Sequence, residues 1–298
     1  MFKKKSILVL LLLLMMVFVT GRGLVEAESN FLWQVENIES DVYLMGSFHL
    51  LPEGHYPLDE TIENAFAESE YLVVEANVLD VDQAEIEAIE YETGFYSGGE
   101  RLSDNIDPEL FQTAKEKVEI FGVTEEVLEQ LRPWYVSLLI AQLQLNELDF
   151  TVEEGVETYF LNKANEQGKE ILELESVAEQ LYMLAGLSPE VQRIALEAEL
   201  EELEDFDGQE LHDMVAAWSE GDKERLEELM FSVRDENPEL EEYYEVVFDQ
   251  RDIEMTDKIE ELIEEGKDVF VVVGAGHLAN KNGILALLEE RDYELKQL

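Results

Sequence analysis

Val42-Tyr-Leu-Met-Gly-Ser-Phe-His49 is an apolar run that reaches a glycine and, three residues later, a histidine. The same design returns near the other end of the chain as Val269-Phe-Val-Val-Val-Gly-Ala-Gly-His277. In each segment we interpret the glycine as the point where the backbone is freed to leave a buried strand. If both strands lie in one parallel sheet, His49 and His277 emerge at its carboxyl edge, where open α/β sheets bind their ligands.

Other runs of apolar and β-branched residues extend the predicted sheet. The expected strands are Val42–Met45, Tyr71–Val78, Glu170–Leu174, Val269–Val273 and Tyr293–Leu298. Tyr71–Val78 and Val269–Val273 are apolar almost throughout, which is typical of parallel strands covered on both faces. The first four strands are expected to be buried.

Between these strands, apolar residues recur at helical spacing. The expected helices are Leu58–Ser69, Pro108–Phe121, Trp134–Asn146, Glu153–Gln167, Val177–Ala185, Pro189–Asp205, Gln209–Ser219, Asp222–Arg234, Glu239–Gly266 and Ile284–Glu290. The pattern predicts an α/β fold whose central, mostly parallel sheet is formed by the N- and C-terminal segments. A large helical insertion, at approximately 79–265, then interrupts a single domain over 28–298.

The first 27 residues have the pattern of a secretory signal. A basic segment at Lys3–Lys5 precedes an apolar run at Ile7–Val19, and Val25-Glu-Ala27 offers small residues for cleavage. The alternative is an uncleaved N-terminal anchor. The protein is therefore expected to be secreted or extracytoplasmic, and to contact a membrane only through this segment if it is uncleaved.

The composition excludes several classes of function. The chain has 20 Lys and Arg against 71 Asp and Glu, a net charge of −51. Such an excess opposes binding to nucleic acid or to anionic membranes, because phosphate recognition needs clustered cations. The chain contains no cysteine, so disulfides and thiol catalysis are excluded.

Two carboxylates occupy positions comparable to those of the histidines. Glu75 follows Leu72-Val-Val, where an unpaired charge would be costly, and Glu175 follows another expected strand. Imidazoles with carboxylates suit zinc, manganese or cobalt, and such a cation can activate water for hydrolysis. We therefore predict His49, His277 and Glu75 as metal ligands, and Glu75, Glu175 and Arg251 as catalytic residues.

Other interpretations of these residues remain open. Both histidines could be structural, Glu75 could simply pair with Arg251, and Glu175 could serve only as a hydrogen-bonding group. The glycines around Gly274 complete neither a dinucleotide-binding nor a P-loop motif. A serine nucleophile would need a G-x-S-x-G elbow, which the sequence lacks.

The ordered blocks of the sequence resemble the TraB/GumN family, which includes the TIKI metalloproteases and bacterial pheromone-shutdown proteins. The blocks are Tyr43–His49, Pro57-Leu58, Tyr71–Glu75, Arg132-Pro-Trp134, Gly155–Phe160, Gly168–Glu175, Gln180, Gln250–Met255, Val271–Leu278 and Gly283. This resemblance implies a fold like that of the erythromycin esterase and ChaN-like haem-binding group. It also implies a metal-dependent hydrolase, with manganese or cobalt, in which the paired histidines and Glu75 bind metal or catalyse. Ser47, Glu157 and Asp252 depart from the residues that are common in the family.

The expected function is thus an exported, metal-dependent metallopeptidase that acts on a peptide or protein substrate. The alternative is a non-catalytic protein that sequesters a peptide or pheromone, or that binds haem or metal. The sequence leaves the substrate, the metal and the oligomeric state open.

Overall fold

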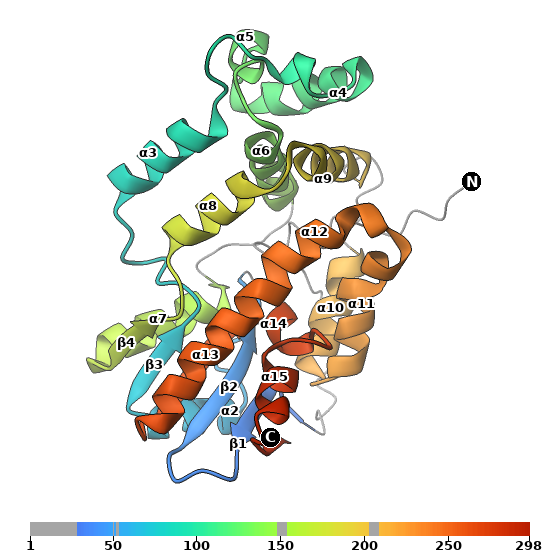
Figure 1. Ribbon diagram of the computed structural model, residues 1–298. Helices are drawn as coiled ribbons and strands as arrows, with labels where there is room; N and C mark the ends of the chain where they lie inside the picture. Colours follow the sequence, from blue (N-terminus) through green and yellow to red (C-terminus); the bar gives the residue numbers. More distant parts are fainter. Residues whose placement is uncertain (1–28, 50, 52–53, 148–153, 203–208) are drawn as a thin grey trace.

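A six-stranded sheet forms the lower part of the molecule in Figure 1. The computed structural model describes residues 29–49, 51, 54–147, 154–202 and 209–298. The strands are β1 (Leu32–Val35), β2 (Val42–Ser47), β3 (Tyr71–Val74), β4 (Glu170–Glu173), β5 (Val269–Gly274) and β6 (Leu295–Gln297). They lie side by side in the order β4-β3-β5-β2-β1-β6.

The strands β4, β3, β5 and β2 run parallel, whereas β1 is antiparallel to both β2 and β6. Val269 at the start of β5 lies between Val42 of β2 and Tyr71 of β3. The carboxyl ends of these three central strands therefore meet at one edge of the sheet. This confirms the predicted α/β class and the mostly parallel sheet built from both ends of the sequence.

Three details of the sheet differ from the prediction. β3 ends at Val74 and not at Val78, so Glu75 follows the strand instead of lying within it. β4 is an edge strand and is only partly buried, because β3 is its sole neighbour among the described strands. β1 was not predicted, because a run of only four residues, Leu32–Val35, carries little periodic signal.

The helices agree with the predicted amphipathic segments apart from their exact ends. They are α2 (Glu60–Glu68), α4 (Pro108–Val118), α6 (Pro133–Glu147), α7 (Val156–Gln167), α8 (Val177–Gly186), α9 (Pro189–Glu202), α10 (Gln209–Ser219), α11 (Lys223–Glu236) and α15 (Ile284–Glu290). The helices α3 (Gln83–Gly94), α5 (Glu125–Leu128) and α14 (Ala275–Ala279) were not predicted. α3 buries only Ile89 and Gly94, so its sequence shows little apolar periodicity, and α5 and α14 are only four and five residues long.

The helix predicted over Glu239–Gly266 is divided. It comprises a short 3₁₀ turn (Pro238–Leu240), α12 (Glu241–Tyr244), the π-helical segment η6 (Glu245–Asp249) and α13 (Gln250–Glu264). The carbonyl of Val247 in η6 accepts a hydrogen bond of 2.9 Å from Arg251 Nη1. π-helical turns within α-helices frequently mark functional sites, and this one ends two residues before Arg251.

The helices α3 to α6, α8 and α9 form an upper half of the molecule, and α12 and α13 run from it across the sheet (Figure 1). This half has apolar clusters of its own. One includes Trp134, Leu184, Tyr244 and Phe248, and the other includes Leu102, Leu131, Val136 and Leu196. The predicted insertion over 79–265 contains β4, so the chain returns to the sheet between its helical stretches.

Some predictions concern residues outside the described ranges. The signal segment at 1–27, the start of the helix expected from Glu153 and the end of the helix expected to reach Asp205 all lie there. Within the described ranges, no helix is both long and apolar enough to cross a membrane. The boundaries of 1–27 and 28–298 remain predictions.

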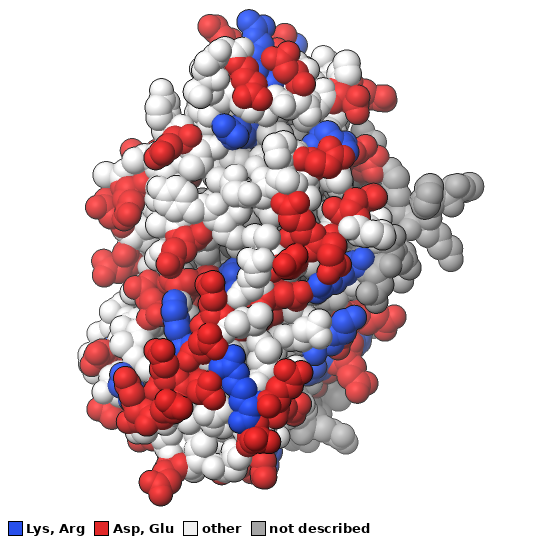
Figure 2. Space-filling view, in the orientation of Figure 1, with Lys and Arg blue, Asp and Glu red and all other residues white. Residues whose placement is uncertain are grey.

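Acidic side chains are spread over the whole of the face shown in Figure 2, with basic side chains scattered singly among them. This distribution agrees with the net charge of −51. No extended basic patch is visible on that face. The expectation that the protein does not bind nucleic acid stays a prediction.

Of the two glycines that precede the histidines, Gly46 is required for space, and neither is required for backbone freedom. Neither Gly46 nor Gly274 has a positive φ, so the interpretation that they free the backbone is wrong. A Cβ on Gly46 would lie 2.4 Å from Cδ1 of Phe31 and 3.2 Å from Cα of Ala275. Gly46 thus allows β2 to pass close beneath the Phe31 ring and the start of α14.

We expect Gly46→Ala to destabilise the protein by about 1–3 kcal/mol, because the methyl group overpacks against the buried Phe31 ring. Urea unfolding should show the loss, and the double variant Phe31→Leu/Gly46→Ala should lose less than the sum of the two single variants. Gly186→Ala is the matched control, because no atom lies within 4 Å of a Cβ at that position. Additive effects in the double variant would contradict this account.

Candidate metal centre

Three side chains converge on the end of β5. A methyl group placed on Gly274 would lie 3.4 Å from Glu75 Oε2, 3.4 Å from His277 Cδ2 and 3.7 Å from His49 Nε2. The sheet register explains this convergence: Ser47 at the end of β2 pairs with Gly274, and β3, which precedes Glu75, lies on the other side of β5. Each group therefore leaves a neighbouring parallel strand at the same edge.

Each histidine is oriented by a carboxylate at its Nδ1 atom. His49 Nδ1 lies 2.5 Å from Glu157 Oε2, and His277 Nδ1 lies 2.7 Å from Asp252 Oδ1. When Nδ1 carries the proton and donates it to the carboxylate, the lone pair is on Nε2. In metal sites, this arrangement orients the imidazole and raises its basicity as a ligand.

Glu157 is itself fixed in place at the start of α7. The Ser47 hydroxyl donates to Glu157 Oε1 at 2.8 Å and also lies 3.1 Å from the carbonyl oxygen of Val273. Glu157 is buried. Both of its carboxylate oxygens are therefore engaged, one by Ser47 and the other by His49.

Asp252 is held in the same way on the other side of the centre. It is completely buried in α13, and the Asn280 amide donates to its Oδ2 at 2.8 Å. Burial raises the pKa of Asp252, and the neighbouring His277 opposes this rise. The same Asn280 amide lies 3.1 Å from Asp249 Oδ1, and Asp249 in turn pairs with Arg234.

Glu75 is the most strongly compensated charge in the site. Its side chain is buried, with Oε2 accepting a 2.9 Å hydrogen bond from the Gly274 backbone N–H and lying 3.8 Å from His277 Nε2. Its Oε1 accepts hydrogen bonds from Gln180, at 2.9 Å, and from Arg251. Burial alone would raise the pKa of Glu75, but Arg251, together with the two histidines, holds it well below its usual value.

Arg251 and Gln180 connect Glu75 to Glu175. Arg251 Nε donates to Glu175 Oε2 at 3.0 Å, its Nη2 contacts both glutamates, and Gln180 Nε2 lies 2.7 Å from Glu175 Oε1. Burial would lower the pKa of Arg251, but the two carboxylates raise it. The expected pairing of Glu75 with Arg251 is thus present alongside the approach of both histidines.

The residues fit a divalent cation. Among the described residues, His49, Glu75 and Glu157 can each offer one ligand atom such that all three atoms lie within 4.8 Å of one another. His277 is not part of that set, although its Nε2 atom lies 3.8 Å from Glu75 Oε2. A mixed imidazole and carboxylate set suits zinc, manganese or cobalt.

The structure thus brings together the five residues predicted from the sequence, which are His49, Glu75, Glu175, Arg251 and His277. Their roles as ligands or catalytic groups remain predictions. Sequence reasoning noted Glu157 and Asp252 only as departures from the family pattern and did not assign them to the site. The available signal for each of these two carboxylates was an acidic residue in an otherwise buried helical turn. Only the tertiary structure shows which histidine each carboxylate contacts.

In the metal-free protein, the His49–Glu157 pair should make stability depend on pH. Burial opposes charging of the His49 imidazole, but Glu157 outweighs it and raises the pKa to about 9, above the usual value of about 6.5. Protonated His49 therefore stabilises the fold fully below pH 6.5, and this contribution is lost as the pH rises through about 9.

The contribution amounts to at most about 3 kcal/mol. With a chelator present, urea unfolding should show that the difference between wild type and His49→Gln shrinks from pH 6 to pH 9.5. The same comparison made in a Glu157→Gln background should show little pH dependence. A constant difference across this range would contradict the assigned pairing.

Comparison with known proteins agrees with the resemblance seen in the sequence. A family model described as the TraB/PrgY/gumN family matches residues 31–297. Curated relatives include "Uncharacterized protein YbaP" from Escherichia coli (strain K12) and from Shigella flexneri. Each is 23% identical over 248 residues, which cover 83% of this chain and 87% of that protein.

No solved structure matches the chain, so the expected likeness to the erythromycin esterase and ChaN-like group stays a prediction. The family match, in contrast, spans every strand of the sheet and all the residues that surround Gly274. The chain belongs to the TraB/PrgY/gumN family.

Proposed function

We propose that this protein is an exported, metal-dependent hydrolase that cleaves a peptide or protein substrate. The observation that carries the proposal is the convergence of His49, Glu75 and His277 around Gly274, with each histidine oriented by a buried carboxylate. The chain belongs to the TraB/PrgY/gumN family, and the resemblance described above implies a metal-dependent hydrolase.

His49 Nε2 and Glu75 Oε2 are the atoms best placed to hold a cation. Glu75 Oε1 is occupied by Arg251 and Gln180, which leaves Oε2 directed to the centre. His277 Nε2 is the third candidate. Glu157 is a further candidate ligand, but both of its carboxylate oxygens are already bonded. This favours a role in which Glu157 orients His49. A divalent cation bound there would polarise a peptide carbonyl and increase the acidity of water.

Arg251 and Glu175 hold the side chains of the centre in position. Arg251 donates four hydrogen bonds to Glu75, Glu175 and the Val247 carbonyl, so we assign it to holding Glu75 in place. Both oxygens of Glu175 accept hydrogen bonds, from Arg251 and from Gln180. This pairing favours a positioning role for Glu175 over the catalytic role expected from the sequence, because both of its oxygens are already engaged.

The natively purified protein is expected to contain about one equivalent of manganese, cobalt or zinc, and to hydrolyse peptides. His49→Ala and His277→Ala should each lose most of the bound metal and the activity, because each removes one imidazole from the centre. Elemental analysis and a peptide-cleavage assay before and after chelation measure both effects. His212→Ala on α10 is the control.

Equal metal content in wild type and both centre variants would contradict a metal site. Metal bound without hydrolysis, together with saturable binding of an intact peptide, would instead favour the sequestering alternative.

Glu157→Gln should weaken metal affinity about 10- to 100-fold, because it removes the negative charge that holds the His49 tautomer. Glu166→Gln, an exposed change on the same helix α7, should leave the affinity unchanged. Competition with a chromogenic chelator measures both affinities. Equal metal affinities in the two variants would show that Glu157 does not support metal binding.

A further inference from the structure

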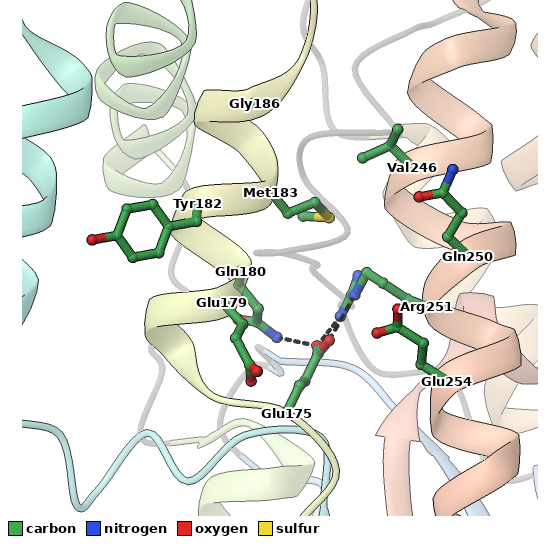
Figure 3. A pocket seen from close by; sticks show the side chains of 10 residues that line it. All are labelled: Glu175, Glu179, Gln180, Tyr182, Met183, Gly186, Val246, Gln250, Arg251 and Glu254. Carbon is green, nitrogen blue, oxygen red and sulfur yellow. Dashed lines mark hydrogen bonds and ion pairs between the residues drawn. The ribbon is translucent and has the colours of Figure 1, made fainter.

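A pocket with a volume of about 310 Å³ lies beside the candidate centre, between α8 and the η6–α13 segment (Figure 3). Its lining residues are Glu175, Glu179, Gln180, Tyr182, Met183, Gly186, Val246, Gln250, Arg251 and Glu254. Gln180 and Arg251 form a shared wall, because each bonds Glu175 in the pocket and Glu75 in the centre. A group bound in the pocket would therefore contact the two residues that also bond Glu75.

The pocket has the size and shape for one side chain. Its volume is at the lower end of the ~300–1,000 Å³ range of ligand pockets, so a single long side chain fits better than a larger ligand. Met183 projects from α8 into the space that separates it from α13, and Val246 lies on the opposite wall (Figure 3). These two residues offer an apolar surface to an aliphatic stem.

The lining is negatively charged. It contains three carboxylates, from Glu175, Glu179 and Glu254, and one guanidinium, from Arg251. Arg251 is already bonded to two glutamates, so it has little capacity to attract an anion. An anionic or purely apolar side chain would therefore be disfavoured here.

One of these carboxylates is available to a ligand. Glu175 is bonded by Arg251 and Gln180, and Glu179 is bonded in the N-terminal capping box of α8 with Ser176. Glu254, on the exposed side of α13, makes no side-chain hydrogen bond or ion pair with any residue that the structure describes. A second metal ion would need several free oxygen ligands, whereas an ammonium or guanidinium group needs only one carboxylate and nearby acceptors.

We propose that this pocket receives a lysine or arginine side chain of the peptide substrate, and that the protein thereby selects basic peptides. The aliphatic stem of such a side chain would lie against Met183 and Val246, with the cationic head at Glu254. The strongly acidic surface would also attract a basic peptide. This inference rests on the proposed function, since it takes a peptide as the substrate.

Peptide binding to the metal-free protein tests the inference without requiring hydrolysis. Fluorescein-labelled alanine-based pentapeptides with a central lysine, arginine, norleucine or glutamate are titrated in chelator, and fluorescence anisotropy is measured. The lysine and arginine peptides should bind about fivefold more tightly than the norleucine peptide, which has the same stem without the charge. The glutamate peptide should bind most weakly.

Three variants distinguish binding in the pocket from the general attraction of a basic peptide to an acidic protein. Glu254→Gln should abolish most of the preference for lysine over norleucine, whereas Glu264→Gln, the same change further along α13, should retain it. Glu254→Lys should shift the preference toward the glutamate peptide. Circular dichroism confirms that each variant is folded.

Equal binding of the lysine and norleucine peptides, binding of none, or an equal loss of preference in Glu264→Gln would overturn the inference. Selective binding of basic peptides by a protein that cleaves none of them with added metal would contradict the hydrolase proposal alone.

Discussion

The buried negative charge of Glu75 is the constraint on which the centre depends. An uncompensated carboxylate in this position would cost several kcal/mol or become protonated. The fold supplies compensation from three directions: the Gly274 backbone N–H from β5, the Gln180 amide from α8 and the Arg251 guanidinium from α13. Since these groups come from widely separated parts of the sequence, the charge links the sheet to the helical half.

The two histidines extend this arrangement into a site with a repeated plan. Each follows a strand of the parallel pair β2 and β5, and each meets a buried carboxylate through Nδ1. The carboxylates come from helices that cover the sheet, Glu157 from α7 and Asp252 from α13. The sheet therefore sets where the imidazoles emerge, and the covering helices set which nitrogen faces the centre. Neither layer could orient the site alone.

The helical half does more than cover the sheet, because it also supplies groups that bond the carboxylates of the centre. The π-helical segment η6 interrupts the long C-terminal helix directly before Arg251, and its Val247 carbonyl accepts one of the guanidinium hydrogen bonds. Across from it, α8 contributes Gln180, which bonds both Glu75 and Glu175. The gap between these two helices is the pocket that adjoins the centre (Figure 3). The wall of the pocket and the electrostatic support of Glu75 thus come from the same two residues, Gln180 and Arg251.

The sequence by itself determined the α/β class, five of the six described strands, and the two G-x-x-H segments whose histidines approach Gly274. It could do so because apolar runs and helical spacing are local signals. The strand β1 and the helices α3, α5 and α14 lacked such periodicity or were too short to show it. No feature of the local sequence indicated that the helix predicted over Glu239–Gly266 is divided. Only the tertiary structure decided that Glu157 and Asp252 orient His49 and His277. It also decided that Arg251 holds Glu75 and Glu175 together. The physical reason is that a buried charge is matched by whichever partner lies near in space, and that proximity is set by strand order and helix packing, not by spacing along the chain.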